Sequence, residues 1–146
     1  MKKSILILFV AFLSATTFAQ TTKQINLKNN VALQGYDPVA YFESAKATEG
    51  KKEIKSEYNG AIYHFSSENN KALFLKNPSQ YEPQFGGFCA YGMSEGYEAP
   101  IQPEAFTIVD GKLYLNYNLK VKEMWSKDHA ARIKKAIVNW ENIQKK

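Results

Sequence analysis

Two dipeptides limit the possible folds of this chain more than any other feature. Asn59-Gly60 and Asp110-Gly111 each stand between two short runs of alternating, largely apolar residues. The central positions of a tight type I′ turn need positive φ, which Asn, Asp and Gly tolerate best. The dipeptides therefore predict two β-hairpins, over 54–65 and over 105–116. Because hairpins need no crossover connection, the strands are expected to pair mainly antiparallel.

Helices are predicted between and after the hairpins. Ser66-Ser67-Glu68 has the pattern of a helix start, in which a serine caps free N–H groups and Glu68 suits the positive end of the helix dipole. Asn77-Pro78 is expected to end this helix. Apolar residues then recur at helical spacing from Asn118 to about Asn142, which predicts a long helix. The predicted fold class is α+β: a small, mainly antiparallel sheet built from two hairpins, packed with a central short helix and a long C-terminal helix.

The first residues of the chain have the organisation of a secretory signal peptide. Lys2 and Lys3 precede a ten-residue apolar run, Ser4–Leu13, and small or weakly polar residues follow up to Ala19. A membrane-spanning helix needs about 20 apolar residues, so this run is too short to favour an anchor. The sequence therefore predicts a cleaved signal peptide at 1–19. The protein is expected to be exported to the periplasm or the cell exterior, with no stable membrane span after cleavage.

Cleavage at this point would leave a chain of single-domain size. About 127 residues remain, for which we predict a flexible lead-in at 20–30 and one domain at 31–146. Without Lys2 and Lys3, 17 basic and 14 acidic residues give a net charge of +3, and the basic residues are scattered along the chain. A nucleic-acid-binding protein would need a clustered basic stripe with interleaved aromatic residues, so nucleic acid is not an expected partner.

Five short segments, in a fixed order, cover most of the predicted domain: GYDPVAYF (35–42), YNGAIYHFSS (58–67), FLKNPSQY (74–81), GGFCA (86–90) and VDGKLYLNY (109–117). Together they resemble the YHS-domain family in its exported bacterial branch. The resemblance implies a small α+β domain. It also implies metal handling, since related YHS modules occur with copper and other heavy-metal transport proteins. Those modules carry an early Cys-rich segment and a Phe-Cys-Ser step, whereas this chain has Phe65-Ser66-Ser67 and no early cysteine.

Cys89 is the single cysteine of the chain and lies in the glycine-rich segment 84–96. Met93 follows four residues later, and Cys and Met are soft donors that select Cu(I) over hard cations. With His64 as a third donor, these residues predict a soft-metal site with copper as the expected ion. Two alternatives stay open. One is a buried, inert thiol beside a gap-filling methionine; the other is a reactive Cys89 thiol in a redox accessory or enzyme.

The two histidines have different predicted environments. His64 shares one face of a strand with Ile62, while Tyr63 and Phe65 share the other face. His129 lies on the apolar arc of the C-terminal helix, where a hydrogen-bonded core histidine is the expected state. One cysteine and two histidines are too few for a closed four-ligand zinc site without carboxylates or a second chain.

A second candidate site consists of Tyr36, Asp37, Tyr41 and Tyr91, as the lining of a cleft for a small molecule. The alternative is that Asp37 holds the Gly-Tyr-Asp-Pro turn through its side chain and that the tyrosines are core and rim residues. The chain has no Gly-x-Ser-x-Gly, His-Glu-x-x-His, phosphate-loop or Cys-x-x-Cys motif, and no catalytic residue is assigned. The leading hypothesis is a binding module for a soft metal ion or a small molecule rather than an enzyme. A structural, partner-binding domain without metal is the third possibility.

Overall fold

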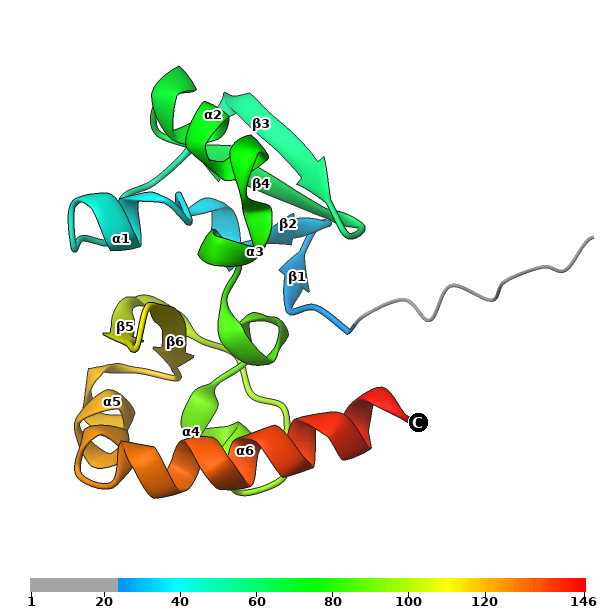
Figure 1. Ribbon diagram of the computed structural model, residues 1–146, viewed down its shortest axis with the longest axis vertical. Helices are drawn as coiled ribbons and strands as arrows, with labels where there is room; N and C mark the ends of the chain where they lie inside the picture. The colour runs from blue at the N-terminus through cyan, green and yellow to red at the C-terminus, as the bar shows by residue number, and fades with distance from the viewer. Residues whose placement is uncertain (1–23) are drawn as a thin grey trace, which may run out of the picture.

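The computed structural model describes residues 24–146, which form two halves stacked on each other (Figure 1). The upper half consists of β1 (Leu27–Lys28), β2 (Val31–Ala32), the 3-10 turn η1 (Leu33–Gly35), α1 (Ala40–Glu43), β3 (Lys51–Tyr58), β4 (Ala61–Phe65), α2 (Glu68–Lys76) and α3 (Pro78–Tyr81). The lower half consists of the 3-10 turn η2 (Gln84–Gly87), α4 (Ala90–Ser94), β5 (Gln102–Val109), β6 (Lys112–Asn116), α5 (Leu119–Ser126) and α6 (His129–Gln144). The long α6 runs along the base of the lower half.

The upper half is a four-stranded sheet, in the order β1-β2-β4-β3, with α2 packed on one face. At the β3–β4 turn, Asn59 and Gly60 have φ of 51° and 80°, which confirms the first predicted hairpin. Phe74 of α2 packs its ring against Tyr63 and Phe65 of β4. The helix starts as predicted, because the Ser67 hydroxyl caps it.

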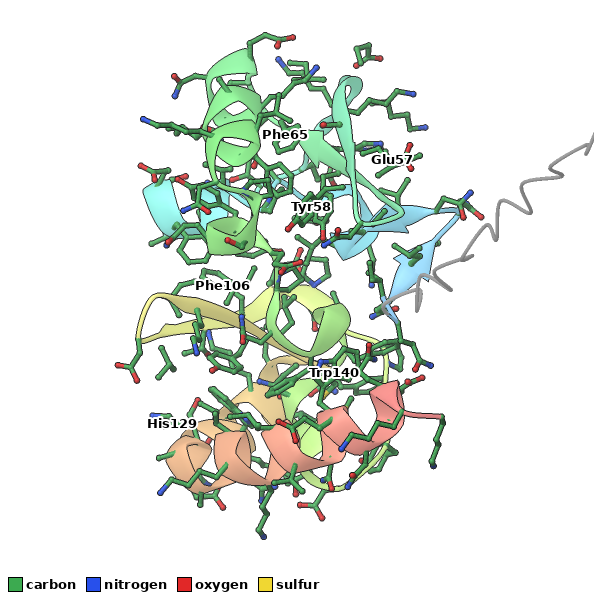
Figure 2. The ribbon with its side chains drawn as sticks, turned by 45° about the vertical axis from the view of Figure 1, so that its right-hand side comes forward. Glu57, Tyr58, Phe65, Phe106, His129 and Trp140 are labelled. Atoms are coloured by element: carbon green, nitrogen blue, oxygen red, sulfur yellow. The ribbon has the colours of Figure 1, made fainter. Side chains whose placement is uncertain are left out.

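The two faces of the β3–β4 hairpin differ in character. Ile62 and His64 of β4 pair with Glu57 and Lys55 of β3, so these four side chains share the face that points away from α2. Figure 2 shows Glu57 directed outward, whereas Tyr58, its neighbour on β3, is directed toward the interior. The alternation predicted for β4 is confirmed, and one face of the sheet is left without a covering helix.

The second hairpin, β5–β6, forms a separate two-stranded sheet in the lower half. Asp110 and Gly111 occupy its turn with φ of 50° and 70°. The α+β class and both antiparallel hairpins are confirmed, but the hairpins lie in two sheets rather than in one. The free edge of β4 is taken by β2 in parallel, and an edge of β6 is bridged by Cys89 opposite Leu115, so the hairpins do not pair with each other.

The predicted long C-terminal helix is present as α6, but it does not extend back to Asn118. Asp128 interrupts the helical path with φ of −142° and ψ of 31°, and α5 precedes it as a separate helix. The Asp128 carboxylate accepts a hydrogen bond from Arg132 Nε at 2.6 Å and does not cap α6. The break rotates the expected apolar arc, so Met124 and Ile137 are 40% and 45% exposed instead of buried.

The two halves share one interior. Tyr63 and Phe65 from the upper half belong to the same buried cluster as Leu113 and Leu115 from the lower half. Three side chains of the upper half also hydrogen-bond across the junction: Gln34 Nε2 to Ile101 O (2.7 Å), Tyr36 OH to Glu104 Oε1 (3.0 Å) and Tyr41 OH to Pro103 O (3.1 Å).

The predicted signal peptide, residues 1–19, and residues 20–23 lie outside the described part of the chain. The rest of the predicted lead-in differs from a loose segment, because it contains β1 and is attached to the lower half. Asn26 donates hydrogen bonds from its backbone nitrogen to Gly86 O and from Nδ2 to Gly87 O. Within residues 24–146, no helix has both the length and the apolar character needed to cross a membrane.

Candidate functional site

The uncovered face of the upper sheet contains an open pocket of about 650 Å³, here called the His64 pocket. It is lined by Lys28, Asn29, Val31, Gln34, Gly35, Tyr36, Glu49, Gly50, Lys52, Lys55, Ile62 and His64. Strand alternation explains its position, since Ile62 and His64 turn away from the core that Tyr63 and Phe65 fill. The residues come from β1, β2, β3, β4 and the segments between them.

His64 is the most enclosed charged or titratable group of the pocket. The residue as a whole is 9% exposed, and neither ring nitrogen has a hydrogen-bond partner among residues 24–146. Neither nitrogen is among the fully buried polar atoms without a partner, so the ring keeps access to the open pocket. Two glycines leave room for His64: a β-carbon at Gly35 would lie 3.2 Å from His64 Nδ1, and one at Gly50 would overlap the His64 main chain. Polar groups that lack a protein partner bond to solvent or to a ligand instead. The imidazole is therefore available to a partner that enters the cavity.

The charges around this ring are mostly positive. Lys28, Lys52 and Lys55 line the pocket, with Glu49 as its one acidic residue. Within the described chain, none of the three lysines forms an ion pair. Burial lowers the pKa of His64, the nearby charges of Lys55 and Lys52 lower it further, and the charge of Glu53 on β3 partly opposes them. The arrangement favours a negatively charged occupant over a cation.

The walls of the pocket also offer apolar surface. Val31 and Ile62 are register partners on neighbouring strands, and both line the cavity. The Tyr36 ring lines it too, while the Tyr36 hydroxyl is engaged by Glu104 in the lower half. That hydrogen bond is the main cause of the raised pKa of Tyr36, so this phenol stays neutral and serves as a wall rather than as a base.

The predicted soft donors are not gathered in one place. Cys89 is 2% exposed and belongs to the core cluster that lies on the other side of β4 from the His64 ring. Its Sγ accepts a hydrogen bond from Gly92 N at 3.5 Å and contacts Asn116 Oδ1 at 3.6 Å, so the thiol caps α4. Met93 is fully buried in a different cluster, with Trp125. Among the described residues, no group of three or more His, Cys, Asp or Glu side chains is arranged to hold a metal ion.

Asp37 has a structural environment. It is fully buried, and its Oδ1 accepts hydrogen bonds from Val39 N (2.9 Å) and Ala40 N (3.3 Å). Its Oδ2 accepts from Ser66 N (2.8 Å), Ser66 Oγ (2.6 Å) and Asn70 Nδ2 (2.7 Å). The carboxylate holds the turn before α1 and joins it to the start of α2, which leaves little capacity for a ligand.

The remaining predicted residues occupy three other places. Tyr41 is buried, with its ring edge against Phe106. Tyr91 lies in the lower half with the Arg132 guanidinium over its ring, 4.0 Å from the centroid. His129 stacks near Trp125 at the start of α6, with Nδ1 3.3 Å from Ser126 O. Of the four residues predicted to line a small-molecule cleft, only Tyr36 lines the His64 pocket.

Comparison with known protein families gives one match. The family model of the YHS domain matches residues 39–84, less than half of the chain. The chain therefore contains a YHS domain. No curated protein and no solved structure matches the chain.

The YHS domain supplies half of the His64 pocket. Glu49, Gly50, Lys52, Lys55, Ile62 and His64 lie within the matched segment, and the other lining residues precede it, between Lys28 and Tyr36. Cys89 and Met93 lie after the matched segment. The pocket is therefore formed by the YHS domain together with the strands that precede it.

The lysines and glycines of this pocket are not among the site residues predicted from the sequence. One signal was available for Lys55. A two-residue turn at Asn59-Gly60 pairs Tyr58 with Ala61. One residue further from the turn on each strand, Glu57 pairs with Ile62, and three residues further, Lys55 pairs with His64. The contributions of Lys28 and Gly35 depend on the parallel pairing of β2 with β4, which no local pattern predicts.

Proposed function

We propose that this protein is an exported binding module whose YHS domain, with the preceding strands, holds a small organic anion in the His64 pocket. The observation that carries the proposal is the His64 ring, which has no protein hydrogen bond, opens onto the pocket and lies beside three lysines without ion pairs. Export rests on the signal-peptide pattern of residues 1–19.

The charge expected of the ligand follows from the charged residues that line the His64 pocket. Exposed ion pairs contribute only about 0.2–1 kcal/mol each, so the three lysines attract and select an anion more than they hold it tightly. The specific contact falls to the His64 ring, because His64 is the least exposed titratable residue of the pocket and a hydrogen bond is stronger where water has less access. Apolar surface from Val31, Ile62 and the Tyr36 ring supports a ligand with a carbon body over a bare inorganic ion.

Copper bound through Cys89 is the competing hypothesis, suggested by the resemblance to metal-associated YHS modules. The geometry supports it less. Cys89 and Met93 are both buried, in separate clusters, and the His64 ring faces away from them. The lysines beside His64 would also repel a cation.

The test is NMR titration of the purified protein with benzoate as an organic anion, sulfate as an inorganic one and benzylammonium as a cation of similar shape. Benzoate is expected to shift the amide signals of Gly35, Gly50 and His64, with a dissociation constant in the millimolar range, or about −4 kcal/mol. Sulfate is expected to bind more weakly, and benzylammonium not at all.

Charge-reversal variants test whether benzoate binds in this pocket or elsewhere on the surface. Lys52→Glu combined with Lys55→Glu is expected to weaken benzoate binding at least tenfold. Lys134→Glu with Lys135→Glu, on the exposed side of α6, makes the same change in net charge and serves as the control. Absence of binding by either anion, or equal loss in both double variants, would rule out the pocket.

An anaerobic Cu(I) titration of the wild type and of Cys89→Ala tests the competing hypothesis directly.

A further inference from the structure

The His64 pocket contains an ionisable ring. The ligand proposed for it carries a charge opposite to that of the protonated ring. Resting on the function proposed above, we propose that anion binding is coupled to the uptake of one proton by His64. The module then binds its ligand under mildly acidic conditions and releases it as the pH rises.

The first support is the close packing of main chain around His64. Gly35, which has φ of +88°, lies against His64 Nδ1, and the Gly50 main chain lies against the His64 main chain. Neighbouring strands on both sides of β4 fix the backbone of this residue. The residue that presents the imidazole to a ligand is therefore held between two strands.

The second support is the set of charges that face the ring from the surrounding elements. These are Lys28 on β1, Tyr36 after η1, Glu49 before β3, and Lys52, Glu53 and Lys55 on β3. Tyr36 stays neutral through its bond to Glu104. Histidine is the side chain whose ordinary pKa lies near neutral pH, so His64 is the switchable group of the pocket.

The direction of the coupling follows from these charges. In the empty pocket, burial and the charges of Lys55 and Lys52 hold the pKa of His64 below its usual value, so the ring is neutral at pH 7. A bound carboxylate offsets the lysine charges and accepts a hydrogen bond from the ring, and both effects favour the imidazolium. The proton taken up by the ring comes from solvent, and affinity rises as the pH falls toward the pKa of the empty site.

The experiment follows the ring itself in the wild-type protein. The pKa values of His64 and His129 are measured from their Cε1–H NMR signals between pH 5 and pH 8, with and without saturating benzoate, whose charge is constant over this range. We expect the His64 pKa to rise by about one unit, which corresponds to roughly tenfold tighter binding at pH 5 than at pH 8. His129, at the start of α6 and outside the pocket (Figure 2), is the internal control and should not respond.

A variant of His64 provides the second test of the coupling. His64→Gln keeps a polar side chain that does not titrate, and its benzoate affinity is expected to be the same at pH 5 and pH 8. Benzoate binding with no change in the His64 pKa would overturn the coupling and leave the proposed function standing. So would an unchanged pH dependence in His64→Gln. If benzoate and sulfate fail to bind at any pH, both the coupling and the proposed function fail.

Discussion

Gly50 lies so close to His64 that a β-carbon at position 50 would come within 2.5 Å of the His64 carbonyl carbon. The backbone of Gly50 has no positive φ, so the glycine is needed for space and not for conformation. The segment before β3 therefore approaches β4 closely, and this approach forms the floor beside the imidazole. Any side chain at position 50 would separate the two segments.

Gly50→Ala is expected to destabilise the protein by about 3 kcal/mol, because the added methyl meets main-chain atoms that cannot move aside. Urea denaturation measures the loss. Gly60→Ala is the matched control: its β-carbon would meet nothing within 4 Å, and only the φ of +80° is unfavourable, at a cost of roughly 1 kcal/mol. Equal losses in the two variants would show that the close approach does not exist.

Asp37→Asn tests the buried carboxylate that joins the turn before α1 to α2. The five donors around Asp37 leave no place for an amide NH₂, since either orientation points it at two or more N–H or O–H groups. We expect a loss of at least about 3 kcal/mol in the free energy of unfolding. Asp128→Asn, at a half-exposed carboxylate that pairs with Arg132, should cost less than about 1 kcal/mol. A mild effect at Asp37 would contradict its structural role.

The Cys89 thiol is expected to be unreactive in the folded protein. It is buried, and it contacts Gly92 N and Asn116. Alkylation by iodoacetamide at pH 8 should be at least about a hundredfold slower in the native protein than in urea, because thiolate exposure limits the rate. Cys89→Ser, which keeps a capping oxygen, should preserve the fold. Rapid alkylation of the native protein would instead favour the redox hypothesis.

The stability of the ligand-free protein should depend on His64 near pH 6. The pKa of this ring is lowered in the folded state, so the unfolded chain binds more protons as the pH drops. The free energy of unfolding is therefore expected to fall below about pH 6.5 and to keep falling until the folded ring is protonated. Urea denaturation at pH 7.5, 6.5 and 5.5 measures this slope, which should be smaller in His64→Gln. The same slope in both proteins would assign the effect to other groups.

Local chemistry explains why much of the fold is predictable from the sequence. Asn59-Gly60 and Asp110-Gly111 specify tight turns, and the Ser67 hydroxyl caps α2, because each depends on residues only a few positions apart. The break at Asp128 is less visible. Apolar spacing continues through it, and the interruption involves an ion pair with Arg132 instead of a helix-breaking residue.

The candidate site was harder to predict, because its residues meet only through long-range pairing. The alternation of Ile62 and His64 is a local property of β4 and is confirmed. The position of Lys28 beside His64 depends on two pairings, β1 with β2 and β2 with β4. Cys89 and Met93 are predicted as metal ligands because they are soft donors four residues apart. Side-chain type does not reveal that the first caps a short helix and the second fills a separate core cluster.

The interior shared by the two halves has a consequence for how this protein can be divided. The segment that defines the YHS domain ends at residue 84, yet Tyr63 and Phe65 inside it pack in one cluster with Leu113 and Leu115 outside it. A fragment cut at the limits of that segment would keep Phe74 against those aromatic rings but would expose the surface that Leu113 and Leu115 cover, and it would lack the Gly35 side of the pocket. We expect the smallest portable unit, whether moved by recombination or by a protein engineer, to run from β1 at least through β6.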